Sequence, residues 1–142
     1  MSFDIFTLQC IRNGEVLQHV PILATKFHKT INMKNLNAIG LDSAKSKKLA
    51  EKLNVLLANY SLFYQNTRGY HWNIKGEKFF ELHLKFEELY NDLVLKIDEV
   101  AERILTLGHS PNHKYSDYKK EAKITEAGKV TDGKKAVEDI LH

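Results

Sequence analysis

Apolar residues recur at alternating steps of three and four along one stretch of this 142-residue chain, and the repeat runs without interruption from Phe79 to Leu107. That spacing is typical of a helix that buries one face. Gly108 follows at a position suited to a left-handed cap, and Pro111 lies just beyond it. The predicted helix, residues 78–107, is roughly 45 Å long, a length typical of helical bundles.

A second helix is predicted over residues 43–70, where leucine and aromatic residues recur at the same steps behind Asp42 or Ser43 as the N-cap. The polar connection from Asn73 to Gly76 is short, and short connections join antiparallel helices. The chain has only seven glycines and two prolines, too few for the many tight turns of a sandwich or barrel. We therefore expect an all-α fold.

The polar residues 109–130 are predicted to form a connection that contains a short helix around residues 116–120. Thr131 or Asp132 then caps a further helix, which carries apolar residues up to the end of the chain. The sequence therefore predicts two long helices and the start of a third.

Residues 1–32 differ in their pattern of apolar residues from residues 33–142 and are predicted to be a separate N-terminal segment. Asn13-Gly14 between apolar runs indicates a hairpin, but two strands alone are marginally stable, so a loosely ordered segment is an equal alternative. Cys10 is the only cysteine, which excludes an intrachain disulfide and favours a reducing cytoplasm. No run approaches the ~18 apolar residues that span a bilayer, so we expect a cytoplasmic protein without a membrane partner.

Two pairs of candidate metal ligands lie on the longest predicted helix at i, i+4 spacing: His83 with Glu87, and Asp98 with Glu102. This spacing places both members of a pair on one face, within reach of a shared ion. Solvated acidic residues are common on helices, and for either pair alone that explanation is the better one. Glu87 and Asp98 share a face but lie ~16 Å apart along the axis, so they cannot share a metal within one chain.

A single site that uses all four side chains needs a second copy of the helix, packed antiparallel across a two-fold axis near Asp92 and Leu93. His71 ends the preceding helix, level with the first turns of the next, and adds a second imidazole; aromatic packing is its alternative role. Nitrogen and oxygen ligands without thiolate suit Fe(II), Mn(II) or Zn(II). The predicted intersubunit metal site consists of His71, His83, Glu87, Asp98 and Glu102.

At these residues the sequence resembles the Dps family, the mini-ferritins known as DNA-binding proteins from starved cells. The resemblance covers about residues 33–142 and is carried by residues 71–76 (HWNIKG), Phe79, His83, Phe86, residues 98–103 (DEVAER) and Leu107-Gly108. It implies a ferritin-like four-helix bundle that forms two-fold dimers within a twelve-subunit shell. It also implies a ferroxidase site between subunits, with both histidines and residue 87 from one subunit and the other two carboxylates from its partner.

The resemblance further implies oxidation of Fe(II), preferentially by hydrogen peroxide, storage of the ferric product inside the shell, and protection of DNA from oxidative damage. Trp72 is implied as a sink for oxidising equivalents, with core packing as an equal alternative. Family members commonly carry Asp where this chain has Glu87, which is one methylene longer. A larger ferritin or bacterioferritin is disfavoured because residues 78–107 contain no Glu-x-x-His pair.

The resemblance also sets two limits. Met33 looks like the ordinary beginning of a family member, so residues 1–32 are expected to be an extension or, preferably, translation from an upstream start. The family continues through complete third and fourth helices, so we expect a C-terminal truncation that leaves apolar surface uncovered. An inactive fragment is therefore one alternative to the iron-oxidising function.

The alternative of a different class is a nucleoid-associated protein that coats DNA. The formal net charge of +3, from 21 basic and 18 acidic side chains, permits non-specific binding to DNA without demanding it. Lys45, Lys47 and Lys48, beside Lys34, could contact phosphates by counterion release, although a solvated first turn of the helix is the better explanation.

Overall fold

The structure, a computed structural model, describes residues 11–12, 15–16 and 35–141, and the chain divides into two units, Met1–Ile31 and Asn32–His142. In the first unit, β1 (Ile11–Arg12) pairs with β2 (Glu15–Val16) in antiparallel register. These strands flank the Asn-Gly pair, where the hairpin alternative places its turn. The other residues of the segment 1–32, on which the choice between the two alternatives also depends, lie outside the described residues. Whether this segment is an extension or the product of an upstream start stays a prediction.

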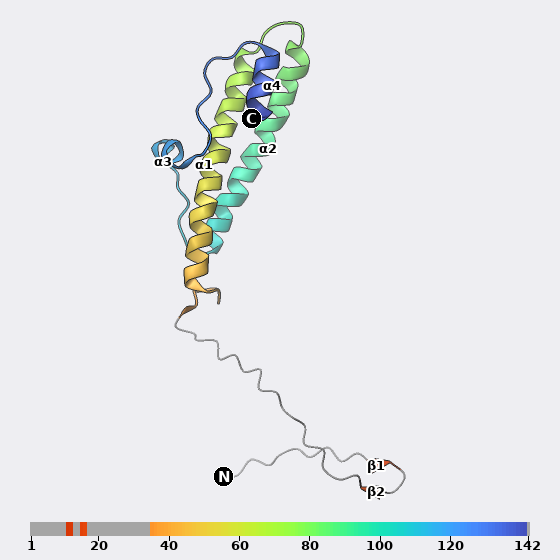
Figure 1. Cartoon of the computed structure of the whole chain (residues 1–142), viewed down its shortest axis with the longest axis vertical. Coiled ribbons are helices and arrows are strands. Elements are labelled where there is room, and N and C mark those ends of the chain that lie inside the picture. The colour runs from red at the N-terminus through yellow and green to blue at the C-terminus, as the bar shows by residue number, and fades with distance from the viewer. Residues whose placement is uncertain (1–10, 13–14, 17–34, 142) are drawn as a thin grey trace. The chain divides into compact units, whose positions relative to one another are not determined.

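The second unit is helical. Its elements are α1 (Ser43–Asn73), α2 (Phe79–Thr106), α3 (Tyr115–Glu121) and α4 (Gly133–Leu141). In Figure 1, α1 and α2 run antiparallel side by side, α4 lies along the end of the pair near their connection, and α3 lies beside α1. The all-α prediction for this part of the chain is confirmed.

Local signals place the helix ends close to their predicted positions. The Asp42 carboxylate accepts from the Lys45 backbone N–H at 2.9 Å, and Asp132 caps α4 by accepting from the Lys135 N–H at 2.8 Å. Gly108 has a φ of +83°, the left-handed conformation expected after α2. The predicted N-caps and the glycine terminator are therefore confirmed.

The first helix continues three residues beyond its predicted end at residue 70. The side chain of Asn73 donates to the Gly69 carbonyl at 2.7 Å, and the Ile74 N–H donates to the Tyr70 carbonyl at 2.9 Å. The second of these bonds satisfies a carbonyl that a helix end otherwise leaves unpaired. The extra turn carries His71 and Trp72 in helical geometry.

Two apolar clusters hold the helices together, one at each end of the α1–α2 pair. One consists of Ala50, Leu57, Ile104 and Leu107. The other consists of Tyr70, Ile74, Phe86 and Ala136, and it includes α4. Burying one large side chain of this kind contributes about 1.5–3 kcal/mol, so these clusters fix the relative rotation of α1 and α2.

The connection between α2 and α4 is attached to α1 by three asparagines, which we call the asparagine anchors: Asn54, Asn59 and Asn66. Each anchor accepts from backbone N–H groups of the connection through its side-chain oxygen. The donors are Asn112 for the first anchor, Lys123 and Ile124 for the second, and Ala127 for the third. A polar segment without a core of its own is thereby held against a helix.

Candidate metal centre

The two histidines predicted as metal ligands lie against each other. His71, in the last turn of α1, is 8% exposed, and His83, in the first turns of α2, is partly buried. Their rings stack with centroids 3.6 Å apart and an interplanar angle of 23°. The expectation that the hairpin brings these residues to the same level is therefore confirmed.

Reciprocal hydrogen bonds set the orientation of both rings. Nδ1 of His71 lies 2.9 Å from the carbonyl oxygen of His83, and Nδ1 of His83 lies 2.9 Å from the carbonyl oxygen of His71. A carbonyl only accepts, so each Nδ1 carries the hydrogen and donates it. In the neutral rings both Nε2 atoms then have a free lone pair, which is the tautomer that metal-ligating histidines commonly adopt.

Aromatic rings enclose the histidine pair on both sides. Phe79 stacks on His83 at 4.9 Å between centroids, and Tyr90 presents its edge to His71 at 5.2 Å. Because both flanking rings come from α2, that helix supports both imidazoles. Side-chain rotation of either histidine would disturb these contacts as well as the carbonyl bond.

The predicted carboxylates lie on one side of α2, which we call the site face. At ~100° per residue, this face spans an arc of about 100°. It consists of Phe80, Leu84, Glu87, Asn91, Val94, Leu95, Asp98, Glu102 and Leu105, all exposed except the partly buried Glu87. An exposed stripe that mixes apolar and acidic side chains is typical of a surface that contacts a partner.

The structure does not bring all five predicted ligands together within one chain. Glu87 lies one turn from His83, whereas Asp98 and Glu102 lie further along α2. Among the described residues there is no group of three or more histidine, cysteine or acidic side chains that could hold a metal ion. The complete ligand set therefore stays a prediction, and it requires a second copy.

Acidic residues elsewhere on α2 pair with lysines. Lys85 contacts Glu88 at 2.6 Å, and Lys96 contacts Asp92 at 2.5 Å, both on the solvated side of the helix next to the site face. Such exposed pairs contribute little to stability. Within residues 35–141 the three carboxylates of the site face make no ion pair. The same holds for Glu99, the exposed acid beside Asp98.

An aromatic cluster around Arg68 adjoins the histidine pair. It was not predicted from the sequence. The Arg68 guanidinium lies 4.7 Å from the Trp72 ring centre and 5.5 Å from those of Tyr64 and Tyr90. Its Nη1 donates to the Tyr64 hydroxyl at 2.7 Å. Residues 64, 68 and 72 follow an i, i+4 spacing, which is the signal that could have revealed all of this cluster except Tyr90.

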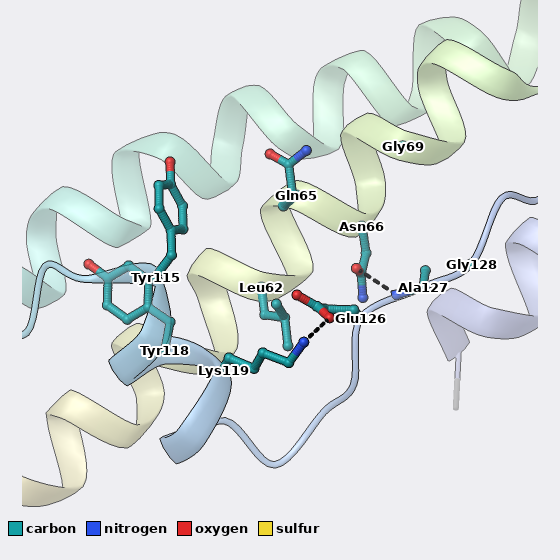
Figure 2. Close-up of a pocket in the computed structure, with 10 residues that line it drawn as sticks. All are labelled: Leu62, Gln65, Asn66, Gly69, Tyr115, Tyr118, Lys119, Glu126, Ala127 and Gly128. Atoms are coloured by element: carbon teal, nitrogen blue, oxygen red, sulfur yellow. Dashed lines mark hydrogen bonds and ion pairs between the residues drawn. The ribbon is translucent and has the colours of Figure 1, made fainter.

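The hollows of the described surface lie away from the histidines. Figure 2 shows one of about 380 Å³ between α1 and the anchored connection, where Asn66 contacts Ala127 and Lys119 pairs with Glu126. None of the predicted ligands lines it. Asp98, by contrast, lines a separate hollow of about 440 Å³. In the described ranges, no helix has both the length and the apolar character needed to cross a membrane.

Comparison with known proteins identifies the class of this fold. The family model of the ferritin-like domain matches residues 50–142. A Dps protein of Vibrio cholerae O1, described as one of the ferritin-like diiron-carboxylate proteins, has a solved structure with a TM-score of 0.74 and 58% identity, covering 75% of this chain and 67% of that one. A Dps structure from Staphylococcus aureus gives a TM-score of 0.63 at 36% identity, covering 66% and 62%.

Two curated relatives are similar to this chain over much of its length. A DNA protection during starvation protein of Porphyromonas gingivalis is 43% identical over 93 residues, 66% of this chain and 58% of that protein. An uncharacterized protein of Haemophilus influenzae is 56% identical over 105 residues, 74% of this chain and 66% of that protein. The chain thus spans less than two thirds of the length of these relatives.

The chain belongs to the ferritin-like proteins and, among them, to the Dps family. The ferritin-like bundle predicted from the sequence is confirmed.

Proposed function

We propose that this protein oxidises Fe(II) with hydrogen peroxide at a site shared by two copies of the chain, and that it thereby protects DNA. The observation that carries the proposal is the reciprocal hydrogen bonding of His71 and His83, which leaves both Nε2 atoms as metal-ligating donors. The description of a similar Vibrio protein as a diiron-carboxylate protein supports iron as the metal.

The order of residues along the site face supports an antiparallel pairing of two copies. With a two-fold axis between residues 92 and 93, Glu87 lies opposite Asp98 of a second copy, and His83 lies opposite Glu102. The same register places Phe80 opposite Leu105. Ligand positions thus meet ligand positions, and Phe80 meets an apolar residue, whereas Asn91 lies opposite Val94 beside the axis.

The side chains nearest the proposed axis differ from those that the sequence suggested. Leu93 is 4% exposed and packs within its own chain, and Asp92 pairs with Lys96 on the solvated side. At this level the site face presents Asn91 and Val94 instead. The level of the axis is retained, but the contacts across it come from these neighbours.

The proposed ligand set suits the oxidation of iron. Neutral imidazoles and carboxylates bind Fe(II), which we treat as the substrate. Three carboxylates supply negative charge that favours Fe(III) over Fe(II), because the attraction grows with the charge of the ion. The longer Glu87 keeps the charge of the family's Asp and reaches further from α2. Storage of the ferric product in a twelve-subunit shell is part of this proposal.

The test measures peroxide-driven Fe(II) oxidation by the chain and its variants. We expect His83→Ala and Asp98→Asn to slow oxidation by about 10- to 100-fold or more, because each removes a ligand from every site. Glu99→Gln is the matched control, since this exposed acid lies off the site face. Rates that stay the same in both ligand variants would refute the assignment.

Mixing these two variants tests whether the site is shared. A dimer of one His83→Ala chain and one Asp98→Asn chain contains one doubly altered site and one intact site. Random assortment should therefore restore about a quarter of the wild-type activity. A site contained within one chain would recover nothing.

DNA coating is the second candidate function. The names of several relatives refer to DNA protection, and Lys45, Lys47 and Lys48 are exposed in the first turns of α1. Phosphate contacts of this kind weaken steeply with salt. A gel shift at graded ionic strength tests this role, and an absence of binding even at low salt removes it.

A further inference from the structure

The aromatic cluster around Arg68 offers two kinds of oxidisable ring close to the proposed iron site. Tyr90 presents its edge to His71 and lies 6.2 Å from Tyr64, with the two phenol rings nearly perpendicular. The Trp72 ring centre lies 4.7 Å from the Arg68 guanidinium, and Trp72 is 57% exposed. Three rings therefore share one cation.

The positive charge of Arg68 affects the oxidation of tryptophan and of tyrosine differently. A guanidinium over a ring is attracted to the electrons of that ring. If Trp72 loses an electron and keeps its proton, the ring becomes positive 4.7 Å from a fixed positive charge, and the two repel. A tyrosine that loses a proton together with the electron stays neutral, and it escapes this repulsion.

The surroundings of Arg68 keep its charge in place. Its Nε is buried and has no hydrogen-bond partner, while Nη1 donates to the Tyr64 hydroxyl. None of the ion pairs in the described residues involves Arg68. Its charge therefore acts on the rings around it without a neutralising carboxylate.

We propose that Tyr90 is the one-electron donor of this site, that Tyr64 shares the resulting radical, and that Arg68 excludes Trp72 from this role. The inference rests on the proposed iron-oxidising function and names the protein residue that takes part in it. It departs from the expectation, drawn from the family resemblance, that Trp72 is the sink.

The electrons and atoms balance in three steps. One Fe(II) and hydrogen peroxide give Fe(III), hydroxide and a hydroxyl radical. The radical takes a hydrogen atom from the Tyr90 hydroxyl, which leaves a neutral tyrosyl radical and water. A second Fe(II) then returns an electron, a proton from solvent restores the phenol, and a second Fe(III) forms. The sum is two Fe(II) oxidised per peroxide, with no radical released.

A second tyrosine pair supplies the control. Tyr115 and Tyr118 on α3 have almost the same geometry, with centroids 6.3 Å apart and an interplanar angle of 87°, and neither ring is among the aromatic contacts of the histidine pair. Tyr115 is 85% exposed. A radical that forms at random should favour this exposed pair, whereas one that forms at the iron site should favour Tyr90 and Tyr64.

The experiment is freeze-quench electron paramagnetic resonance of the 142-residue chain mixed with Fe(II) and hydrogen peroxide. We expect a tyrosyl signal that narrows when the tyrosines are ring-deuterated, that is lost in Tyr90→Phe, and that persists in Tyr115→Phe and Trp72→Phe. A spin trap should capture severalfold more hydroxyl radical from Tyr90→Phe. Arg68→Gln should move part of the signal to Trp72, a change that a purely structural arginine would not produce.

The outcomes separate the two proposals. If the wild-type chain oxidises no Fe(II) with peroxide, the proposed function and this inference both fail. If oxidation proceeds but the radical signal is unchanged in Tyr90→Phe, or is lost in Trp72→Phe, only the inference fails.

Discussion

Burial of a single phenol makes the stability of this fold depend on alkaline pH. Tyr70 is 3% exposed, and its pKa is raised from 10.0, first by burial and then by the charge of Asp139, against an opposing effect of Lys135. Above pH 10.0 the unfolded phenol loses its proton while the folded one retains it. Stability is therefore fully present below that pH and falls as the pH rises above it.

We expect Tyr70→Phe to reduce this alkaline loss of stability, because phenylalanine has no proton to lose. Urea unfolding of both proteins at neutral pH and above pH 10.0 measures the effect. Tyr115→Phe serves as the control at an exposed position. An equal alkaline loss in Tyr70→Phe and the wild type would contradict the assignment to this residue.

At the same scale, the spacing of residues along the sequence predicted the candidate ligands but not the hydrogen bonds that orient the two histidines. The i, i+4 pairs and the level of His71 follow from helix geometry, which the sequence specifies through its apolar repeat. The carbonyl bonds between His71 and His83 depend on the rotation of α1 against α2, which apolar packing sets. The Arg68 cluster depends on the same rotation, since Tyr90 comes from the other helix.

At the scale of elements, the connection between α2 and α4 depends on the asparagine anchors. Asn66 both accepts from the Ala127 N–H and donates to the Thr125 carbonyl, at 2.9 Å each. We expect Asn66→Ala to lower the free energy of unfolding by about 1–3 kcal/mol, because two backbone groups lose their partners. Chemical denaturation measures this, and Gln65→Ala is the exposed neighbouring control.

Hydrogen exchange localises the same effect. The amide of Ala127 should exchange faster in Asn66→Ala. The exchange rates of the Lys123 and Ile124 amides, which donate hydrogen bonds to the Asn59 side chain, should change less. Uniform acceleration along residues 109–130 would instead show that the anchors act as one unit. The sequence predicted this polar connection and its short helix, but not the anchors, because bonds between residues about 60 positions apart leave no periodic signal.

At the scale of the whole molecule, the proposed pairing depends on the apolar part of the site face. In the register described above, Leu84 lies opposite Ala101 of a second copy, and Ala101 lines a hollow of about 440 Å³. Leu84 is 54% exposed in the single chain. Burial of such a side chain contributes about 1.5–3 kcal/mol, so the hollow is a suitable place for it.

We expect Leu84→Glu to weaken self-association by roughly 10- to 100-fold, which sedimentation at graded concentration measures. Lys85→Glu introduces the same residue one position away on the solvated side and should leave association unchanged. Equal association of the two variants would show that the site face is not the contact. The sequence predicted that a second copy is needed, from the ~16 Å between the carboxylates, but the hollow became visible only in the folded chain.

The mutual lock between the two imidazoles has a consequence for when chemistry can start. Each single chain already holds its two imidazole ligands in place. In the proposed arrangement it still lacks the two carboxylates that a second chain provides. At low abundance the number of completed centres then grows with the square of the amount of chain. A newly synthesised single chain would therefore not oxidise Fe(II) with peroxide until it pairs with a second copy.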